Sequence, residues 1–188
     1  MIRLVAAILV VTALVGCSSI PIGTAGKLRT LDYLNDDVAS LLLAFDLPPE
    51  LEPAQGASTL SFDITTPASG AKHIEAKLVA ADADELAGTL PPPSGERNYY
   101  LFGFSDADKQ AIREAQAWAR GLPPGNNAFS ISLSPRLCRT AEINPAKTTV
   151  SALVALPGAT GLSPLLSNQP LNAVLQGAEI PACAGHSG

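Results

Sequence analysis

The sequence predicts a mainly β fold, an immunoglobulin-like β-sandwich that carries one inserted amphipathic helix at about residues 105–121. Short segments of alternating apolar and polar residues recur along the chain, and loops rich in proline, glycine and serine separate them. A single long segment has clear helical periodicity. These observations leave one alternative open, an α+β fold in which the helix packs on a single antiparallel sheet.

The first folded segment has a mixed pattern. Leu28, Leu31 and Leu34 have helical spacing, whereas apolar residues alternate from Ala39 to Leu47, as in a strand. Two prolines follow Leu47 and would end any helix there. We therefore expect a short helix or turn and then a strand over about 38–47.

Two half-buried strands are predicted next, at 59–65 and 72–80, because apolar and polar residues alternate in both segments. Residues 67–70 between them have turn composition, so we expect an antiparallel hairpin. The following segment, 81–96, contains three consecutive prolines and is expected to be a surface loop.

A strand from Asn98 to Phe104 is predicted to lead directly into the helix. Ser105 is the expected N-cap, and Asp106 and Asp108 place negative charge at the positive end of the helix dipole. We expect Trp118 to insert into a sheet. The predicted apolar stripe consists of Ala107, Ala111, Ala115, Trp118 and Leu122, with Ile112 and Ala119 beside it.

The C-terminal third contains two further strand patterns. Residues 129–134 alternate apolar residues with serines, and 149–156 is apolar on both faces, as a central strand is. A short strand at Leu165 and Leu166 and a helical turn at 172–176 complete the expected elements.

The N-terminus has the organisation of a secretory signal peptide, residues 1–16. Arg3 supplies positive charge, Leu4–Leu14 is apolar, and small Gly16 precedes Cys17. The apolar segment is too short to span a bilayer, which takes about 20 residues. Leu14-Val15-Gly16-Cys17 forms a lipobox, and here the chain resembles bacterial lipoproteins.

The resemblance implies acylation of Cys17, cleavage before it, a lipidated tether over 17–27 and a single β-rich domain over 28–188. Multiple acyl chains hold a protein firmly on a membrane. The implied location is the cell envelope and, in a Gram-negative host, the outer membrane facing the periplasm, because Ser18 follows the anchor instead of aspartate. The general layout is also similar to small bacterial lipoproteins of unknown function.

The two remaining cysteines, Cys138 and Cys183, form an even pair in an oxidising compartment, so we expect a disulfide. A redox-active site is not favoured, because the chain has no Cys-x-x-Cys motif.

The charge balance excludes nucleic acid as a partner. The chain has 12 basic and 17 acidic side chains and a net charge of −5, and its basic residues are scattered. The membrane is expected to be engaged through the acyl chains.

Catalytic motifs are weak. Ser69 and Lys72 match a Ser-x-x-Lys element, but the companion motifs of that enzyme class are missing. His73 lies within a predicted strand and His186 in the C-terminal tail, and no nucleophile-elbow motif accompanies them. We expect no catalytic residue, no metal and no cofactor.

Acidic residues at Asp82, Asp84 and Glu85 lack the spacing of a calcium loop. They motivate one alternative function, an envelope hydrolase that acts on peptidoglycan or glycan with carboxylates as acid and base. Convergence of these acids in a pocket would favour that hypothesis.

Tyr99 and Tyr100 are the candidate binding surface, since a tyrosine ring combines apolar area with a polar end. The preferred hypothesis is a noncatalytic, membrane-anchored envelope lipoprotein that acts as a binding, scaffolding or assembly module for an envelope protein. A third hypothesis is a carrier of an apolar ligand, which requires an open apolar cavity.

Overall fold

The computed structural model describes residues 31–66, 70–82, 90–92, 95–122, 128–175 and 178–184. The predicted signal peptide at 1–16, the lipidation site Cys17 and the tether at 17–27 lie outside these ranges. Within them, no helix has the length and hydropathy needed to cross a bilayer.

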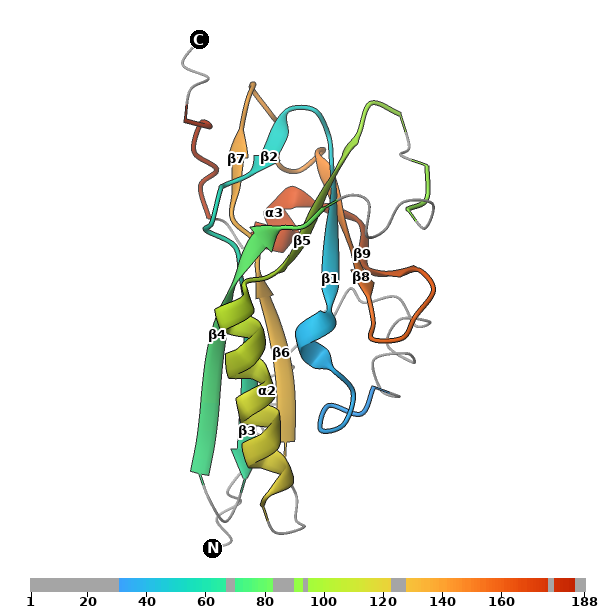
Figure 1. Cartoon of the computed structure of the whole chain (residues 1–188). Coiled ribbons are helices and arrows are strands. Elements are labelled where there is room, and N and C mark those ends of the chain that lie inside the picture. The colour runs from blue at the N-terminus through green and yellow to red at the C-terminus, as the bar shows by residue number, and fades with distance from the viewer. Residues whose placement is uncertain are drawn as a thin grey trace, which may run out of the picture.

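The described chain is mainly β and builds one curled antiparallel sheet of seven strands, in the order β6-β3-β4-β5-β1-β8-β9 (Figure 1). An immunoglobulin-like sandwich is not confirmed, because all seven strands are hydrogen-bonded into a single sheet. The arrangement fits the alternative, a single sheet with a packed helix. The strands are β1 (Leu42–Leu47), β3 (Thr59–Thr66), β4 (Gly70–Ala80), β5 (Asn98–Phe104), β6 (Ala128–Ser134), β8 (Thr149–Ala155) and β9 (Leu162–Pro170).

A small second sheet pairs β2 (Leu51–Pro53) with β7 (Leu137–Arg139) at one end of the molecule (Figure 1). The sequence did not predict either strand, because three residues are too few to establish an alternating pattern.

The segment before β1 corrects one boundary. The strand expected over 38–47 begins only at Leu42, because the 3₁₀ helix η1 (Val38–Ser40) precedes it. Val38 and Ala39 are fully buried. Two adjacent buried side chains suit a tight helical turn better than a strand, whose neighbours point to opposite faces.

The predicted hairpin is confirmed. β3 and β4 pair antiparallel, with Asp63 opposite His73, while 67–69 of the expected turn lie outside the described residues. The central position of β8 is also confirmed, since β8 lies between β1 and β9. β9 is longer than the two-residue strand expected there, and α3 (Leu171–Leu175) follows it directly.

The helix α2 (Asp106–Arg120) is confirmed, with Ser105 as its N-cap: the Ser105 hydroxyl accepts a hydrogen bond from the Asp108 N–H at 3.1 Å. The predicted apolar stripe is rotated. Ala107 is exposed and Trp118 is only half-buried. The buried face consists of Ile112, Ala115, Gln116 and Ala119.

Polar contacts explain this rotation. The Gln116 amide is buried and donates to the carbonyl oxygens of Tyr33 and Asp36, both at 2.8 Å, which fixes the helix against the segment before η1. Trp118 packs on the sheet as expected: it is half-buried against the cluster that includes Ile64 of β3, and the Lys72 ammonium of β4 lies 5.5 Å from its ring centroid.

The main hydrophobic core lies inside the curl of the sheet. Residues from β6, β8, β9 and α3 line one small cavity there, of about 20 Å³, so the two ends of the sheet approach each other around a packed interior. The largest fully buried side chains of this core are Phe62, Leu43, Leu47, Leu51, Leu78, Leu171 and Val38.

Candidate binding site

β4 pairs only with the C-terminal part of β5. The N-terminal part of the β5 edge therefore has no neighbouring strand among the described residues. Their ladder pairs Leu78 with Phe104 and Ala80 with Phe102, and its last bond runs from the Ala81 N–H to the Leu101 carbonyl at 3.0 Å. β5 pairs with β1 further, as far as Asn98. The first three residues of β5 therefore have a described strand partner on one side only.

Tyr99 carries the backbone groups that face this open edge. The backbone N–H and C=O groups of successive residues alternate between the two edges of a strand. The N–H and C=O of Tyr99 therefore point to the same edge as those of Leu101. The backbone N–H and C=O of Tyr100 point to β1, where Phe45 is the opposite residue. No described strand pairs with Tyr99 on the open side.

A pocket of about 610 Å³ opens at this edge, which we call the β5 pocket. Tyr99 and Tyr100 point to opposite faces of the strand, yet both line the pocket, as expected for a pocket that opens at the edge of a sheet. Its lining residues are Glu52, Pro53, Gln55, Gly56, Leu78, Val79, Ala80, Ala81, Tyr99, Tyr100, Leu101 and Phe102.

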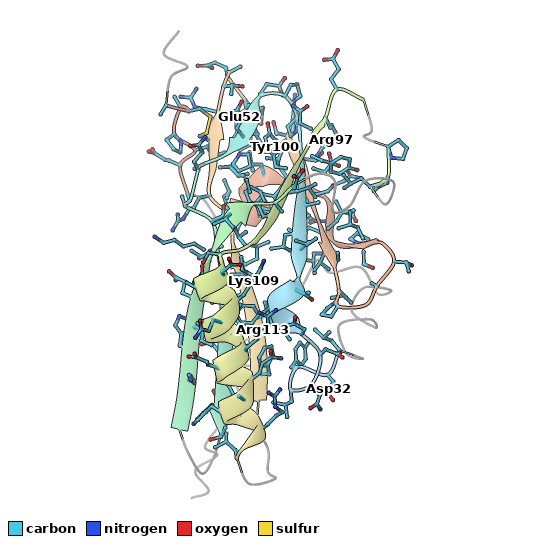
Figure 2. All side chains as sticks on the ribbon, viewed as in Figure 1. Asp32, Glu52, Arg97, Tyr100, Lys109 and Arg113 are labelled. Carbon is cyan, nitrogen blue, oxygen red and sulfur yellow. A yellow bond between two sulfur atoms is a disulfide. The ribbon has the colours of Figure 1, made fainter. Side chains whose placement is uncertain are left out.

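The lining is mostly apolar. Val79 is 38% exposed and is the one large hydrophobic side chain that the described residues leave exposed. Among the described residues of the lining, Glu52 is the one that carries a charge. Figure 2 shows Glu52, Tyr100 and Arg97 at one end of the molecule, away from Lys109 and Arg113 on the helix.

Both tyrosines lie in an environment that disfavours their ionised form. Burial raises the pKa of Tyr100, the negative charge of Glu52 raises it further, and a hydrogen bond with Asn98 opposes this. Burial also raises the pKa of Tyr99, with a further contribution from the charge of Asp46. Both hydroxyls therefore stay protonated at neutral pH and can donate hydrogen bonds.

A buried ion pair fixes the start of β5. Asp46 and Arg97 side chains are 11% and 12% exposed, and the Arg97 Nε donates to Asp46 Oδ1 at 2.7 Å. The Arg97 guanidinium also donates to the carbonyl oxygens of Asp46 at 2.6 Å and Thr149 at 3.2 Å. This pair could not be predicted from the sequence, since 51 residues separate its members and neither belongs to a motif.

The opposite wall of the pocket belongs to the small sheet, which the predicted disulfide stabilises. Cys138 in β7 is bonded to Cys183, as expected. The C-terminal segment, 178–184, is also joined to β7 by backbone hydrogen bonds: Arg139 N–H donates to the Pro181 carbonyl and Cys183 N–H to the Arg139 carbonyl, both at 2.9 Å.

The Glu52 carboxylate lies within 4.8 Å of both disulfide sulfurs. Oxidised sulfur does not supply the thiolate that binds metal. This set of residues therefore does not form a metal site while the disulfide is intact.

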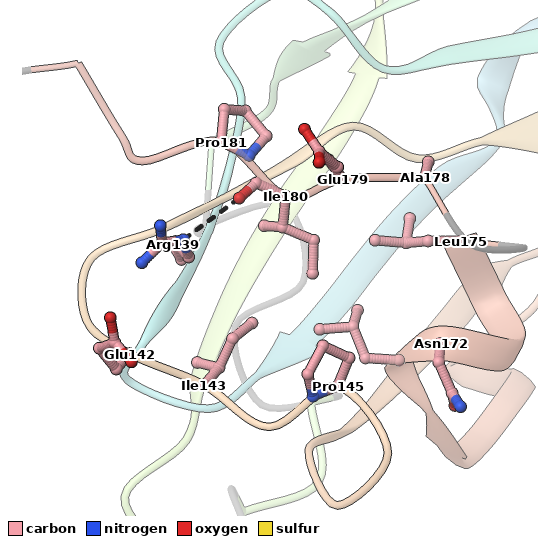
Figure 3. A pocket seen from close by; sticks show the side chains of 11 residues that line it. Arg139, Glu142, Ile143, Pro145, Asn172, Leu175, Ala178, Glu179, Ile180 and Pro181 are labelled. Atoms are coloured by element: carbon pink, nitrogen blue, oxygen red, sulfur yellow. Dashed lines mark hydrogen bonds between the residues drawn. The ribbon is translucent and has the colours of Figure 1, made fainter.

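A second pocket, the C-terminal pocket, of about 670 Å³, lies between α3, the β7–β8 loop and the C-terminal segment (Figure 3). Its walls include Ile143, Leu175 and Ile180, and Arg139 donates from Nε to the Ile180 carbonyl at 3.2 Å. Glu142 and Glu179 also line it, so its charged side chains are of both signs.

Of the three acids that motivated a hydrolase, the described residues include only Asp82, so their convergence in a pocket stays a prediction. Asp82 is exposed, whereas Asp84 and Glu85 lie outside the described residues, as does Ser69. His73 Nδ1 lies 2.7 Å from Asp63 Oδ1 on an exposed face of the sheet, where both side chains are about half exposed, 58% and 42%. Neither residue lines the β5 pocket or the C-terminal pocket.

The cavity inside the curl of the sheet bears on the carrier hypothesis. At about 20 Å³ it has room for about one water molecule and not for an acyl chain.

Comparison with protein-family models, with curated proteins and with solved structures gave no match.

Proposed function

We propose that this protein is a noncatalytic binding module of the bacterial cell envelope, anchored through Cys17, and that the β5 pocket holds a segment of a partner protein. One observation carries the proposal: Tyr99 and Tyr100 line a pocket of about 610 Å³ beside a strand edge that lacks a described neighbour. Pockets of this size are typical of ligand sites.

The composition of the pocket favours a protein ligand. Apolar side chains dominate the lining, Val79 is exposed, and Tyr99 offers a backbone donor and acceptor at the edge. A polypeptide segment supplies both matching features at once, namely apolar side chains and backbone hydrogen-bonding groups.

The anchor explains where such a module works. Cys17, at the end of the lipobox, is the proposed acylation site, and the tether over 17–27 would connect the domain to the membrane. In a Gram-negative host the proposed location is the outer membrane, on its periplasmic face.

A photoreactive amino acid at Val79 tests the proposal in the native cells. We expect a discrete protein adduct, identified by mass spectrometry, because Val79 is exposed within the pocket. Glu75 is the matched control: it is exposed on the same strand and face, about 13 Å away by strand geometry. An adduct of equal yield at both positions, or none at Val79, would contradict the proposal.

A further inference from the structure

We propose that the partner segment is an extended strand that adds to the edge of β5 at Tyr99 and places a lysine or arginine side chain against Glu52. This inference rests on the proposed function and specifies the chemistry of its partner.

The backbone geometry favours an added strand in line with the end of β4. The Ala81 N–H already bonds the Leu101 carbonyl, so the next pair of backbone groups along this edge belongs to Tyr99, and the pair after that to Arg97. At about 3.4 Å per residue, the edge from Leu101 to Arg97 is roughly 14 Å long and accommodates four or five residues of an extended segment.

Arg97 can keep its position while a strand adds. Its side chain is directed to Asp46 and Thr149, and these contacts fix the backbone at the start of the open edge. A fixed edge avoids much of the ordering cost that a flexible one would add to binding.

The side chains of the added strand would alternate between two apolar surfaces. Tyr99 and Leu101 line the pocket from one face of β5, and Tyr100 and Phe102 from the other. Apolar residues of the partner are therefore expected on both faces of its strand, as in other segments recognised by β-strand addition.

Charge complementarity selects a basic residue. Glu52 is the one charged side chain of the lining, and no ion pair joins it to a cation among the described residues. Glu52 belongs to β2, in the small sheet that forms the opposite wall of the pocket. A partner lysine or arginine would form a charge-assisted hydrogen bond there, while an acidic residue would be repelled.

A randomised heptapeptide display library, selected on the mature protein, tests this inference. We expect enriched sequences with apolar residues at consecutive positions, which face both sides of a strand, and one lysine or arginine. Replacing that basic residue with glutamine should weaken binding roughly tenfold, as a charge-assisted hydrogen bond implies. Selection on Glu52→Gln should lose the basic preference. Glu142→Gln, which removes an exposed carboxylate of the C-terminal pocket, should retain it.

The outcomes separate the two proposals. Suppose that the enriched peptides compete with adduct formation at Val79. If they contain no preferred lysine or arginine, or if this preference persists in peptides selected on Glu52→Gln, this inference is overturned and the proposed function stands. A bound peptide that does not protect the Tyr99 amide from hydrogen exchange would overturn strand addition. No enrichment, together with no adduct at Val79, would overturn both proposals.

Discussion

The two ends of the molecule are stabilised in different ways. At one end, α2 packs on the sheet near β3, β4 and β6 (Figure 1), and apolar contacts of Ile64, Ala115 and Ala119 fill the space between them. At the other end, the small sheet, the start of β5 and the C-terminal segment are joined by a few specific links. These are the disulfide and the Asp46–Arg97 pair.

The difference explains where a binding site is available. Packing an apolar helix on a sheet fills the space it covers. A covalent bond or a buried ion pair fixes two segments without filling the space beside them. The β5 pocket and the C-terminal pocket both lie at the linked end, so that end combines a fixed backbone with open space.

The largest expected effect comes from breaking the buried ion pair. Arg97→Ala leaves the Asp46 carboxylate buried without its cation, so the free energy of unfolding should fall by about 3–5 kcal/mol. Arg113→Ala removes an exposed pair with Asp37 at the helix-covered end and should lower the free energy of unfolding far less, because solvent screens this pair. Urea denaturation of both variants measures this, and equal losses would contradict the comparison.

Removing the disulfide should have the next largest effect. The bond closes a loop with a sequence separation of 45 residues, and the Cys138→Ser, Cys183→Ser variant should lose about 2–4 kcal/mol. The melting temperature should fall by several degrees. Thermal unfolding and thiol titration check this. Free thiols in the native protein would show that the pair is not bonded.

A smaller loss is expected for binding at the pocket. Tyr99→Ala removes a ring that lines the β5 pocket, and partner affinity should fall by about 2 kcal/mol, as for an aromatic at the centre of an interface. Tyr33→Ala is the control, because Tyr33 stacks on Phe129 with ring centroids 4.3 Å apart at the helix-covered end. Adduct yield at Val79 measures both, and an equal decrease would rule out a local role for Tyr99.

The smallest effect concerns pH. The hydrogen bond from Arg113 lowers the pKa of Asp37 below its ordinary value of 3.8, so the folded state favours the ionised carboxylate. The stability from this pair is therefore complete above pH 3.8 and is lost as the pH falls through the lowered pKa. Both side chains are about half exposed, so the loss should be a few tenths of a kcal/mol. Asp37→Asn should abolish this loss of stability at low pH, which unfolding curves from pH 6 to 3 measure. An unchanged pH dependence in this variant would show that the loss does not come from Asp37.

Much of the secondary structure could be predicted because its signals are local. The alternation in β3, β4, β5 and β6 and the Ser105 cap of α2 depend on neighbouring residues alone. The layer arrangement depends on which strands meet, and alternation fits a sandwich and a curled single sheet equally well. The burial of Gln116 also requires distant carbonyl groups, at Tyr33 and Asp36.

The site could be predicted in part. Tyr99 and Tyr100 were identified from residue type alone, and the structure places both in one pocket. The pocket itself depends on where β4 leaves β5 and on the small sheet opposite. Glu52 and Arg97 were missed, because only the fold brings Glu52 into the pocket with Tyr100 and Arg97 into contact with Asp46.

The open edge of β5 is the central claim, and amide hydrogen exchange of the free protein tests it most directly. Tyr99 and Tyr100 are neighbours, but only Tyr100 points its N–H to β1. We predict fast exchange at Tyr99 and slow exchange at Tyr100, measured by NMR on the same sample. Equal protection of the two amides would show that the edge is already paired and would contradict the account.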